Sequence, residues 1–474
     1  MHRLILFAAV FLLFTGFKAE NPVLLKFIEG NITGEKFKLK VQFNVYEDSV
    51  THLFSAKMNI PAQMVQDYPV TVVKYASDSV VFKLEGLLKA SFSGKVFADS
   101  IAGNWTQSGQ VFQLILKNVV SPLRPQNPQK PYPYFEEEVL YTNKEKSIRY
   151  GATLTIPKGK TKVPAVILIT GSGQQDRDET LFGHKPFLVI ADYLTRNGIA
   201  VLRVDDRGIG KTTGDVRDAT SKDFSTDVLA GIDFLKTRTE INSGAIGLVG
   251  HSEGSMIALL AAGNNKDVSF IVSLAGPGVK GREIMISQTS HGLKKMKIND
   301  TAISKVIELR TMIADVLASE PYISTAKQKI MAYLTIWMAN QDSLTKVGAG
   351  FIFQNGGWTS NGAGYDLFMN QMMLPWMKYF IAFDPKTALA NVNCPLLVLN
   401  GEKDMQVFCD LNINGFKSVA TDLKMTKMDF YQFAELNHFF QHCKTGEMDE
   451  ISQIEETFAV EVLKKMADWI HHAQ

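Results

Sequence analysis

One short motif constrains this chain more than any other feature: a Gly-x-Ser-x-Gly sequence at residues 250–254. Residues 245–249 before it are apolar and favour a β-strand, and residues 255–262 behind it are small and favour a helix. A serine at such a junction lies on a tight, strained turn that lifts its hydroxyl clear of the sheet. The flanking glycines are needed because a Cβ there would collide with the neighbouring strand or helix. Ser252 is therefore a candidate nucleophile; the alternative is a Gly-rich turn with an incidental serine.

The composition is that of a folded protein with more than one domain. The 474 residues are 46% apolar and 21% charged, which is too long for one ordinary domain and sufficient for a large core. The 50 Lys and Arg residues nearly balance the 48 Asp and Glu residues, so the net charge is +2. No basic run is long enough to follow a phosphate backbone. We therefore expect two or three domains and no nucleic-acid partner.

The first 19 residues have the features of a secretory signal peptide. His2 and Arg3 precede an apolar stretch, residues 4–14, and the segment 15–19 that follows contains the small residues Gly16 and Ala19. The 11 apolar residues of this stretch are fewer than the roughly 20 that span a bilayer. A buried N-terminal helix is the alternative. We expect an exported protein, periplasmic or extracellular, without a transmembrane segment.

Three regions are expected after the signal peptide. Residues 20–119 alternate apolar and polar side chains and predict a small antiparallel β domain. The five prolines of residues 120–135 predict a stiff linker. Residues 136–474 alternate apolar runs with helical stretches, which is typical of a mostly parallel, doubly wound sheet with both faces covered. Its expected strands are 163–170, 199–204, 245–249, 270–274 and 395–399.

Two segments within these regions carry more specific expectations. The Gly-rich residues 103–109 predict a turn that enters the last strand of the β domain, and Trp105 there is more typical of core packing than of a ligand contact. Residues 279–385 interrupt the sheet with amphipathic helical patterns and predict a helical cap insertion. The apolar residues expected in its core, or in a lid over a pocket, are Met372, Met373, Trp376, Tyr379 and Phe380.

A serine nucleophile needs an acid and a base downstream, in the order Ser, acid, His. The apolar run 395–399 leads directly into a loop that carries Asp404. This position at the end of a buried strand favours Asp404 as the acid, ahead of Glu402 and Asp410.

The base is expected at His438. This histidine follows a β-like stretch, residues 428–433, and lies downstream of the acid as the chain order requires. His442 is its rival but lies deeper in the following segment, and His471 and His472 lie at the end of the chain. A hydrogen-bonded structural role is the alternative for His438.

Acyl transfer also needs backbone N–H donors for the oxyanion that forms. Glu253 supplies one as the residue after the nucleophile, and the glycine-flanked Ser172 supplies the other. The charged residues 176–178 follow at once and are expected to brace this loop through ion pairs. The chemistry requires neither a cofactor nor a metal ion, and we expect none.

Residues 208–212 invite interpretation as a phosphate-binding loop. Asp205 stands where that motif requires its first glycine, which excludes nucleotide binding. We expect Asp206 and Arg207 to hold the loop after residue 204 in shape beside the site.

Three cysteines are too few for a disulfide scaffold. Cys409 and Cys443 each lie five residues beyond an expected catalytic residue, so one bridge between them is conceivable from the spacing. Three thiols without a bridge, with Cys394 as the third, are the equal alternative.

Five segments together resemble the esterase D group of bacterial α/β-hydrolases: 170–178, 205–211, 250–254, 401–407 and 437–441. The resemblance covers about residue 136 to the end, with one departure, because Gln174 and Gln175 stand where relatives commonly have Pro. It implies an α/β-hydrolase fold and a carboxylesterase with Ser252, Asp404 and His438 as its triad. The N-terminal β domain also looks like one fused to such esterases in some bacteria.

The leading interpretation is an exported serine esterase that works through an acyl-enzyme. Its substrate would be a small-molecule ester, with acylated carbohydrates among the candidates. A serine peptidase, a deacetylase or a thioesterase on the same fold is the nearest alternative, because all share the triad. A noncatalytic binding protein of the cell envelope is the alternative from another class. No ligand of the β domain is predicted.

Overall fold

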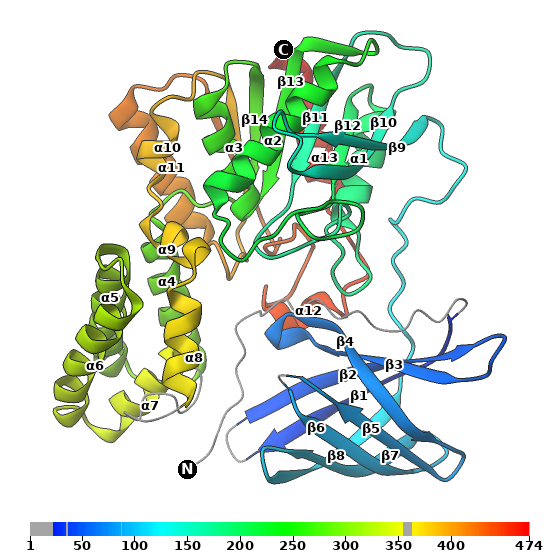
Figure 1. The fold of residues 1–474 in the computed structure, drawn as a ribbon, viewed down its shortest axis with the longest axis vertical. Coiled ribbons are helices and arrows are strands. Elements are labelled where there is room, and N and C mark those ends of the chain that lie inside the picture. Colours follow the sequence, from blue (N-terminus) through cyan, green and yellow to red (C-terminus); the bar gives the residue numbers. More distant parts are fainter. Residues whose placement is uncertain (1–21, 35–36, 87, 354–362, 474) are drawn as a thin grey trace. The chain divides into compact units, whose positions relative to one another are not determined.

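The computed structural model describes residues 22–34, 37–86, 88–353 and 363–473. The predicted signal peptide, residues 1–19, lies outside this part of the chain. The chain divides into two compact units (Figure 1). The first contains the residues up to 123 together with 181–183 and 447–455. The second contains residues 124–180, 184–446 and 456–474.

The first unit is built on a closed barrel of eight antiparallel strands. Each strand pairs with the next in sequence, and β1 closes the barrel on β8, where Ile28 lies opposite Asn118. The predicted alternation of side chains places every second residue inside. The strands are β1 (Pro22–Gly34), β2 (Phe37–Asp48), β3 (Phe54–Ile60), β4 (Val65–Tyr75), β5 (Ser79–Leu84), β6 (Ala90–Val96), β7 (Ser100–Gln107) and β8 (Gln110–Asn118).

Aromatic side chains fill the barrel. Phe43 and Phe82 stack with ring centroids 5.2 Å apart, and Trp105 is fully buried among the same core residues. The core role predicted for Trp105 is confirmed. The turn predicted over residues 103–109 is present before β8 but is confined to Ser108 and Gly109, because β7 continues through Gln107. The glycine at 103 reflects close packing of strands: a Cβ there would lie 2.0 Å from a backbone oxygen of β6.

Two short segments from later in the chain complete the first unit. The backbone N–H of Phe182 donates to Gln66 Oε1 at 2.8 Å. The short helix α12 (Met448–Ile451) contacts the 3₁₀ turn η1 (Pro61–Gln63), and Gln42 Nε2 donates to Ser452 Oγ at 3.3 Å. The expected β domain, residues 20–119, did not include these segments.

The second unit is built on an eight-stranded sheet in the order β16-β15-β14-β13-β11-β12-β10-β9. Neighbours from β12 through β11 to β16 are parallel, whereas β10 is antiparallel to both β12 and β9. The five predicted apolar runs form β11 to β15, all of them parallel. The strands are β9 (Phe135–Thr142), β10 (Arg149–Ile156), β11 (Val163–Ile169), β12 (Ala200–Val204), β13 (Ile241–His251), β14 (Val268–Leu274), β15 (Leu396–Gly401) and β16 (Met428–Phe433).

Helices cover both faces of this sheet (Figure 1), as its apolar strands require. One face packs against α1 (Pro186–Arg196) and α13 (Val460–His472). The other packs against α2 (Ser221–Lys236), α3 (Glu253–Asn264), α10 (Pro385–Leu389) and α11 (Cys409–Leu423). This mixed sheet with helices on both sides is compatible with the expected fold class.

The chain between β14 and β15 forms a group of helices with a core of its own. Ile313, Leu334 and Met372 are buried within it. The helices are α4 (Gly281–Lys295), α5 (Asp300–Ser319), α6 (Ile323–Ala339), α7 (Ser343–Ile352), α8 (Ala363–Met372) and α9 (Pro375–Ala382).

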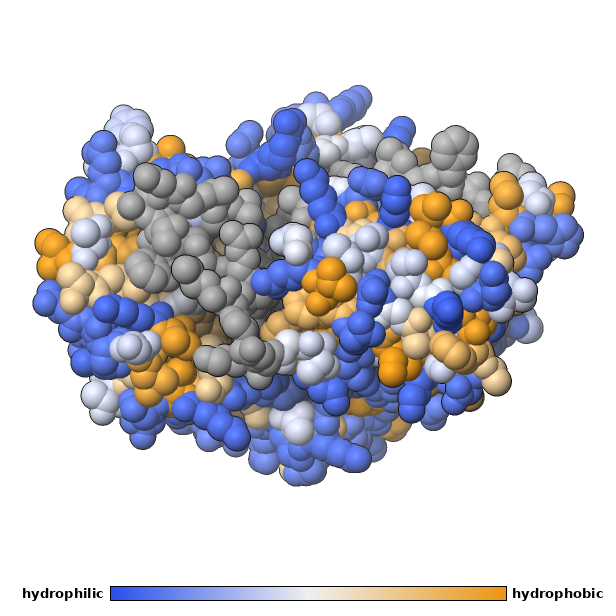
Figure 2. Space-filling view, turned by 90° about the horizontal axis from the view of Figure 1, so that it is seen from below, coloured by the Kyte–Doolittle hydropathy of each residue, from blue (hydrophilic) through white to orange (hydrophobic). Residues whose placement is uncertain are grey.

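Hydrophobic residues on the face that Figure 2 shows are broken into small patches by hydrophilic ones. Within the described ranges, no helix combines the length and the apolar character that a membrane span requires. In the same part of the chain, no disulfide joins Cys394, Cys409 and Cys443, which agrees with the alternative without a bridge.

Candidate active site

Ser252 occupies the sharp turn between β13 and α3 that the motif predicts. Its backbone has φ 53° and ψ −119°, a left-handed conformation that non-glycine residues rarely adopt. A Cβ on Gly250 would lie 2.2 Å from the Gly254 carbonyl oxygen, and one on Gly254 would lie 2.1 Å from that of Ile169. Both glycines are therefore required by close backbone approach, as predicted. The Ser252 side chain stays half-buried at the edge of the sheet.

Asp404 and His438 meet at the same edge. His438 Nδ1 lies 2.7 Å from Asp404 Oδ2, and both side chains are buried. The other carboxylate oxygen of Asp404 accepts the backbone N–H groups of Gln406 and Val407, each at 2.8 Å. These bonds leave one carboxylate oxygen aimed at the imidazole, which is how an acid orients a base.

The alternative acids and bases lie elsewhere. Glu402 and Asp410 are exposed, and Asp410 accepts from Gln432 at 3.3 Å. His442 is paired with Glu456 at 2.9 Å. The structure therefore brings together only the acid and base that the chain order favours, within the described residues.

The loop after β11 lies directly beside the nucleophile. A Cβ on Gly171 would lie 3.3 Å from the Ser252 Cβ, so only glycine allows this approach without displacement. Ser172, the next residue, is exposed at the site. Glu253 is the first residue of α3, where backbone N–H groups have no acceptor within the helix. The loop that carries Ser172 and the first turn of α3, which carries Glu253, therefore both border Ser252.

The half-buried Asp206 holds this loop in place. Asp206 accepts from Thr170 Oγ1 and from the Gln175 backbone N–H, both at 2.8 Å. Burial raises the pKa of Asp206 well above its ordinary value. Gln174, part of the departure from the resembled family, donates to the Arg207 carbonyl oxygen at 2.8 Å. These bonds join the loop after residue 204, which Asp206 and Arg207 were expected to hold in shape, to the loop after β11.

Ion pairs brace the far end of the same loop. Arg177 binds Asp205 with Nη2 and Oδ2 2.6 Å apart and also reaches Glu138 at 2.7 Å. Asp178 binds Arg203. The predicted brace is confirmed, and Asp205, which replaces the glycine of a phosphate loop, is its central acceptor.

Sequence reasoning missed the role of the Glu253 side chain. This buried carboxylate accepts from Ser221 Oγ and from Trp376 Nε1 of α9, each at 2.7 Å. Burial raises the pKa of Glu253. Trp376, expected as core or lid, thus connects the inserted helices to the nucleophile turn. The partners lie 123 positions apart in sequence, so no local pattern signals the contact.

A second missed group is the buried pair of His251 and Glu179, whose Nδ1 and Oε1 atoms lie 2.9 Å apart. Glu179 Oε1 also accepts the Gly171 backbone N–H at 2.9 Å. Burial opposes a charge on His251, but the adjacent Glu179 carboxylate outweighs it, so that the pKa of His251 is raised. Both pair members border the loop and the nucleophile.

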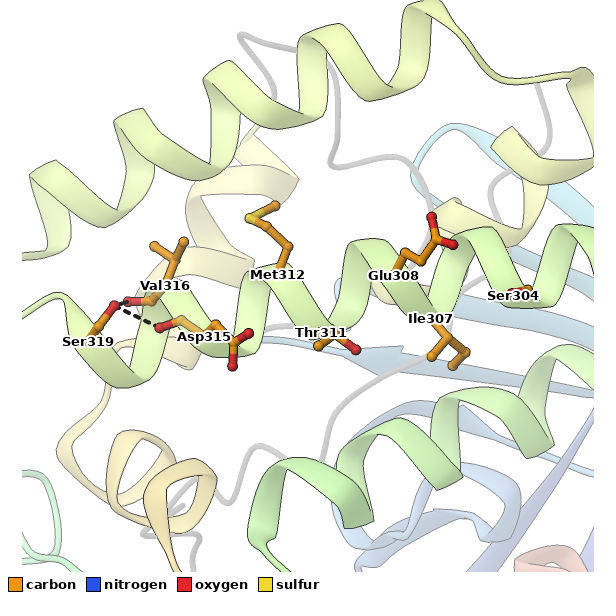
Figure 3. A pocket seen from close by; sticks show the side chains of 8 residues that line it. All are labelled: Ser304, Ile307, Glu308, Thr311, Met312, Asp315, Val316 and Ser319. Atoms are coloured by element: carbon orange, nitrogen blue, oxygen red, sulfur yellow. Dashed lines mark hydrogen bonds between the residues drawn. The ribbon is translucent and has the colours of Figure 1, made fainter.

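A groove elsewhere in the second unit has no such chemistry. It has a volume of about 570 Å³ and follows one side of α5 in the inserted helices (Figure 3). Its side chains project from successive turns of this one helix, and none belongs to the residues around Ser252. The lining residues are Ser304, Ile307, Glu308, Thr311, Met312, Asp315, Val316 and Ser319.

Comparison with known proteins gives partial matches. Residues 186–348 match the family described as serine aminopeptidase, S33. The esterase EstD of Thermotoga maritima is 33% identical over 138 residues, which is 29% of this chain. The match spans only 33% of that esterase.

Solved structures of low sequence identity were also found. An esterase of Pyrococcus furiosus is 14% identical with a TM-score of 0.41, covering 75% of this chain and 98% of its own. The dienelactone hydrolase of Anabaena variabilis is 15% identical with a TM-score of 0.39, covering 72% of this chain and 99% of its own.

Proposed function

We propose that this protein is a serine hydrolase of the α/β-hydrolase class that cleaves carboxylic esters. The observation that carries the proposal is the buried hydrogen bond of 2.7 Å between His438 and Asp404 at the sheet edge where Ser252 occupies its strained turn. The partial match to an esterase supports the same activity. The substrate is a small-molecule ester, and acylated carbohydrates are candidates for it.

The mechanism is a two-step acyl transfer. His438 takes the proton of the Ser252 hydroxyl as Oγ attacks the ester carbonyl carbon, and the N–H groups of Ser172 and Glu253 bind the resulting oxyanion. Collapse breaks the ester C–O bond, and His438 returns the proton to the leaving alcohol. Water then attacks the acyl carbon while His438 takes its proton. Collapse of this second intermediate breaks the bond between the acyl carbon and Ser252 Oγ, His438 returns the proton to Oγ, and the acid departs. Asp404 remains ionised and orients His438 throughout.

The direct test is hydrolysis of p-nitrophenyl acetate by the wild type and by a Ser252→Ala variant. The variant should lose at least about 10⁴-fold in kcat/KM, because nucleophile and base act as one unit. A fluorophosphonate probe should label the wild type at Ser252 and leave the variant unlabelled. Full activity of the folded Ser252→Ala variant would sink the proposal.

A serine peptidase is the second candidate, and the match of residues 186–348 to a serine aminopeptidase family favours it. Deacetylase and thioesterase activity would use the same residues. Parallel assays with p-nitrophenyl esters, acetylated sugars and peptide anilides separate these substrates. Labelling of Ser252 without turnover of any ester would favour the peptidase. Absence of both labelling and turnover would favour a noncatalytic binding protein.

We further propose export and a domain order of signal peptide (1–19), β domain (20–119), linker (120–135) and hydrolase domain (136–474), with a helical cap at about 279–385. The charged and apolar start of the chain supports export. Expression with these residues in a bacterial host, followed by mass spectrometry of the exported fraction, should detect a mature N-terminus that results from cleavage near Gly16 or Ala19. An intact N-terminus on exported protein would contradict the proposed cleavage.

A further inference from the structure

His251 and Glu179 form a buried charged pair that the acyl-transfer steps do not use. His251 occupies the first variable position of the Gly-x-Ser-x-Gly motif, at the end of β13. Apolar side chains, among them Phe187, Leu274 and Phe439, surround the pair. In such surroundings each charge requires a partner, because an unpaired buried charge is strongly destabilising.

The hydrogen bonds define the protonation of His251. Its Nδ1 faces Glu179 Oε1 at 2.9 Å and its Nε2 faces the backbone oxygen of His438 at 3.0 Å. A carbonyl oxygen and a carboxylate can only accept, whereas a neutral imidazole carries a single N–H. When Glu179 is ionised, both bonds exist together only if His251 is an imidazolium, and the raised pKa of His251 favours this state.

These bonds connect two segments that meet at the proposed active site. The Gly171 N–H donates to Glu179, whose carboxylate binds His251, and His251 donates in turn to the His438 carbonyl oxygen. Gly171 precedes the proposed oxyanion donor, and His438 is the proposed base. This series of hydrogen bonds therefore passes through His251, the residue immediately before the nucleophile Ser252.

We propose that His251 and Glu179 act as a positioning pair that holds the oxyanion loop and the base loop in their working positions relative to Ser252. The proposal rests on the proposed function. Neither side chain needs to touch substrate. Glu179 has a left-handed φ of 53°, and its two donors account for this unfavourable conformation being retained. His251 is well placed for the role because β13 pairs it with Leu274 of β14 and so limits its movement.

The kinetic consequence follows from what each loop contributes. An oxyanion donor acts mainly in the transition state, so its displacement lowers kcat more than it raises KM. A misplacement of about 1 Å can cost on the order of 10²-fold in rate. His251→Gln and Glu179→Gln should each lower kcat per active site by up to about this amount. The double variant should lose little more than the more damaged single variant, because both substitutions break one chain of bonds.

The experiment measures p-nitrophenyl acetate hydrolysis by the full chain, with active sites counted by fluorophosphonate labelling. His442→Gln is the matched control: His442 lies four residues beyond His438 and pairs with Glu456 at 2.9 Å, but contacts neither the oxyanion loop nor His251 in the described structure. Its kcat should stay near that of the wild type. Glu179→Gln keeps an acceptor for Gly171 and is the milder variant if His251→Gln does not fold.

The outcomes are distinguishable. A fall in kcat per labelled site that is shared by both single variants and not multiplied in the double variant supports the positioning pair. A lower melting temperature with unchanged kcat per labelled site would show a purely structural ion pair and overturn the positioning role. A fall in kcat in the double variant that equals the product of the two single falls would also overturn it. If the wild type itself neither labels nor turns over, the proposed function fails, whereas active variants in an active background overturn the positioning role alone.

Discussion

The two compact units bury different kinds of polar side chain. The barrel buries mainly uncharged amides: Gln107 accepts from Trp105 and donates to the Leu88 carbonyl oxygen, so its bonds remain within the core. Its buried acid, Asp48, accepts two backbone N–H groups of the turn that follows β2. These groups satisfy the barrel's own backbone and core.

The second unit instead buries ionisable groups around the carboxyl edge of its parallel strands. Four of them form two pairs, His251 with Glu179 and His438 with Asp404, and both pairs join segments that are far apart in the sequence. Burial of charge is costly unless each charge is paired. These groups lie around Ser252, the nucleophile of the proposed active site. The groups are Glu179, Asp205, His251, Glu253, Asp404 and His438.

The largest effect should come from Asp404. Asp404→Asn keeps the shape of the side chain but favours the wrong tautomer of His438, which should lower kcat by about 10⁴-fold. Steady-state kinetics on p-nitrophenyl acetate measure it, and Asp410→Asn on the exposed start of α11 is the matched control. Comparable losses of kcat in Asp404→Asn and Asp410→Asn would show that the buried acid contributes no more to the reaction than an exposed one.

A substitution in the barrel should instead cost stability. Trp105→Ala removes a fully buried indole and should lower the free energy of unfolding of the first unit by about 3–5 kcal/mol. The kcat of the folded protein should not change. Ile115→Ala, at a side chain that is 55% exposed on β8, is the control and should cost less than about 0.5 kcal/mol.

Urea denaturation followed by far-ultraviolet circular dichroism measures the first quantity, because Trp105 is the only tryptophan of the first unit, and ester hydrolysis in the absence of urea measures the second. A large loss of kcat in well-folded Trp105→Ala protein would contradict the view that the barrel's polar groups are purely structural. It would also give this domain a part in the reaction.

The sequence predicts those features of the site that a local pattern carries. The nucleophile turn follows from glycines on either side of Ser252, and the acid follows from a loop at the end of an apolar strand. Because the carboxyl ends of parallel strands meet at one edge, two such loops predict that Asp404 and His438 approach each other. The hydrogen bond between them in the structure has this origin.

Contacts between distant segments leave no such pattern. Closure of the barrel pairs β1 with β8, and the barrel unit takes in residues 181–183 and 447–455, which a window of neighbouring residues cannot reveal. The pair of His251 and Glu179 spans 72 positions. Neither residue alone is marked by a sequence pattern. The fold brings both into an apolar environment, where each charge needs a partner.

A smaller effect is expected where the inserted helices meet the site. Trp376→Phe keeps the stacking on Phe380, whose ring lies 5.9 Å away, but removes the N–H that Glu253 accepts. A hydrogen bond to a buried charged group contributes about 1.5–3 kcal/mol, so the free energy of unfolding should fall by up to this amount. Trp469→Phe, whose indole binds Asp429 on an exposed part of the surface, is the control and should cost less.

Denaturant unfolding of both tryptophan variants measures the difference. Equal losses of unfolding free energy in Trp376→Phe and Trp469→Phe would mean that the buried bond to Glu253 stabilises the protein no more than the exposed bond to Asp429. The buried acids of the second unit would then differ from surface acids in location only.

The smallest effect should be a pH dependence of stability that comes from Glu253. Burial raises its pKa in the folded protein, so the folded state binds the proton more tightly than the unfolded state. Stability contributed by this proton is therefore complete below the ordinary pKa and is lost as pH rises through the raised one. Glu253→Gln does not titrate, so its stability relative to the wild type should increase with pH across that window.

Asp215 supplies a control of opposite sign. Its hydrogen bond with Arg217 lowers the pKa of Asp215 to about 2, so its contribution is present above the ordinary pKa and is lost as pH falls through the lowered one. Relative to the wild type, Asp215→Asn should therefore lose stability as pH rises through this lower window. Urea denaturation of both variants between about pH 2 and pH 8 measures the two slopes. Slopes of the same sign would contradict the assignment of Glu253 as an acid whose charge is opposed by burial.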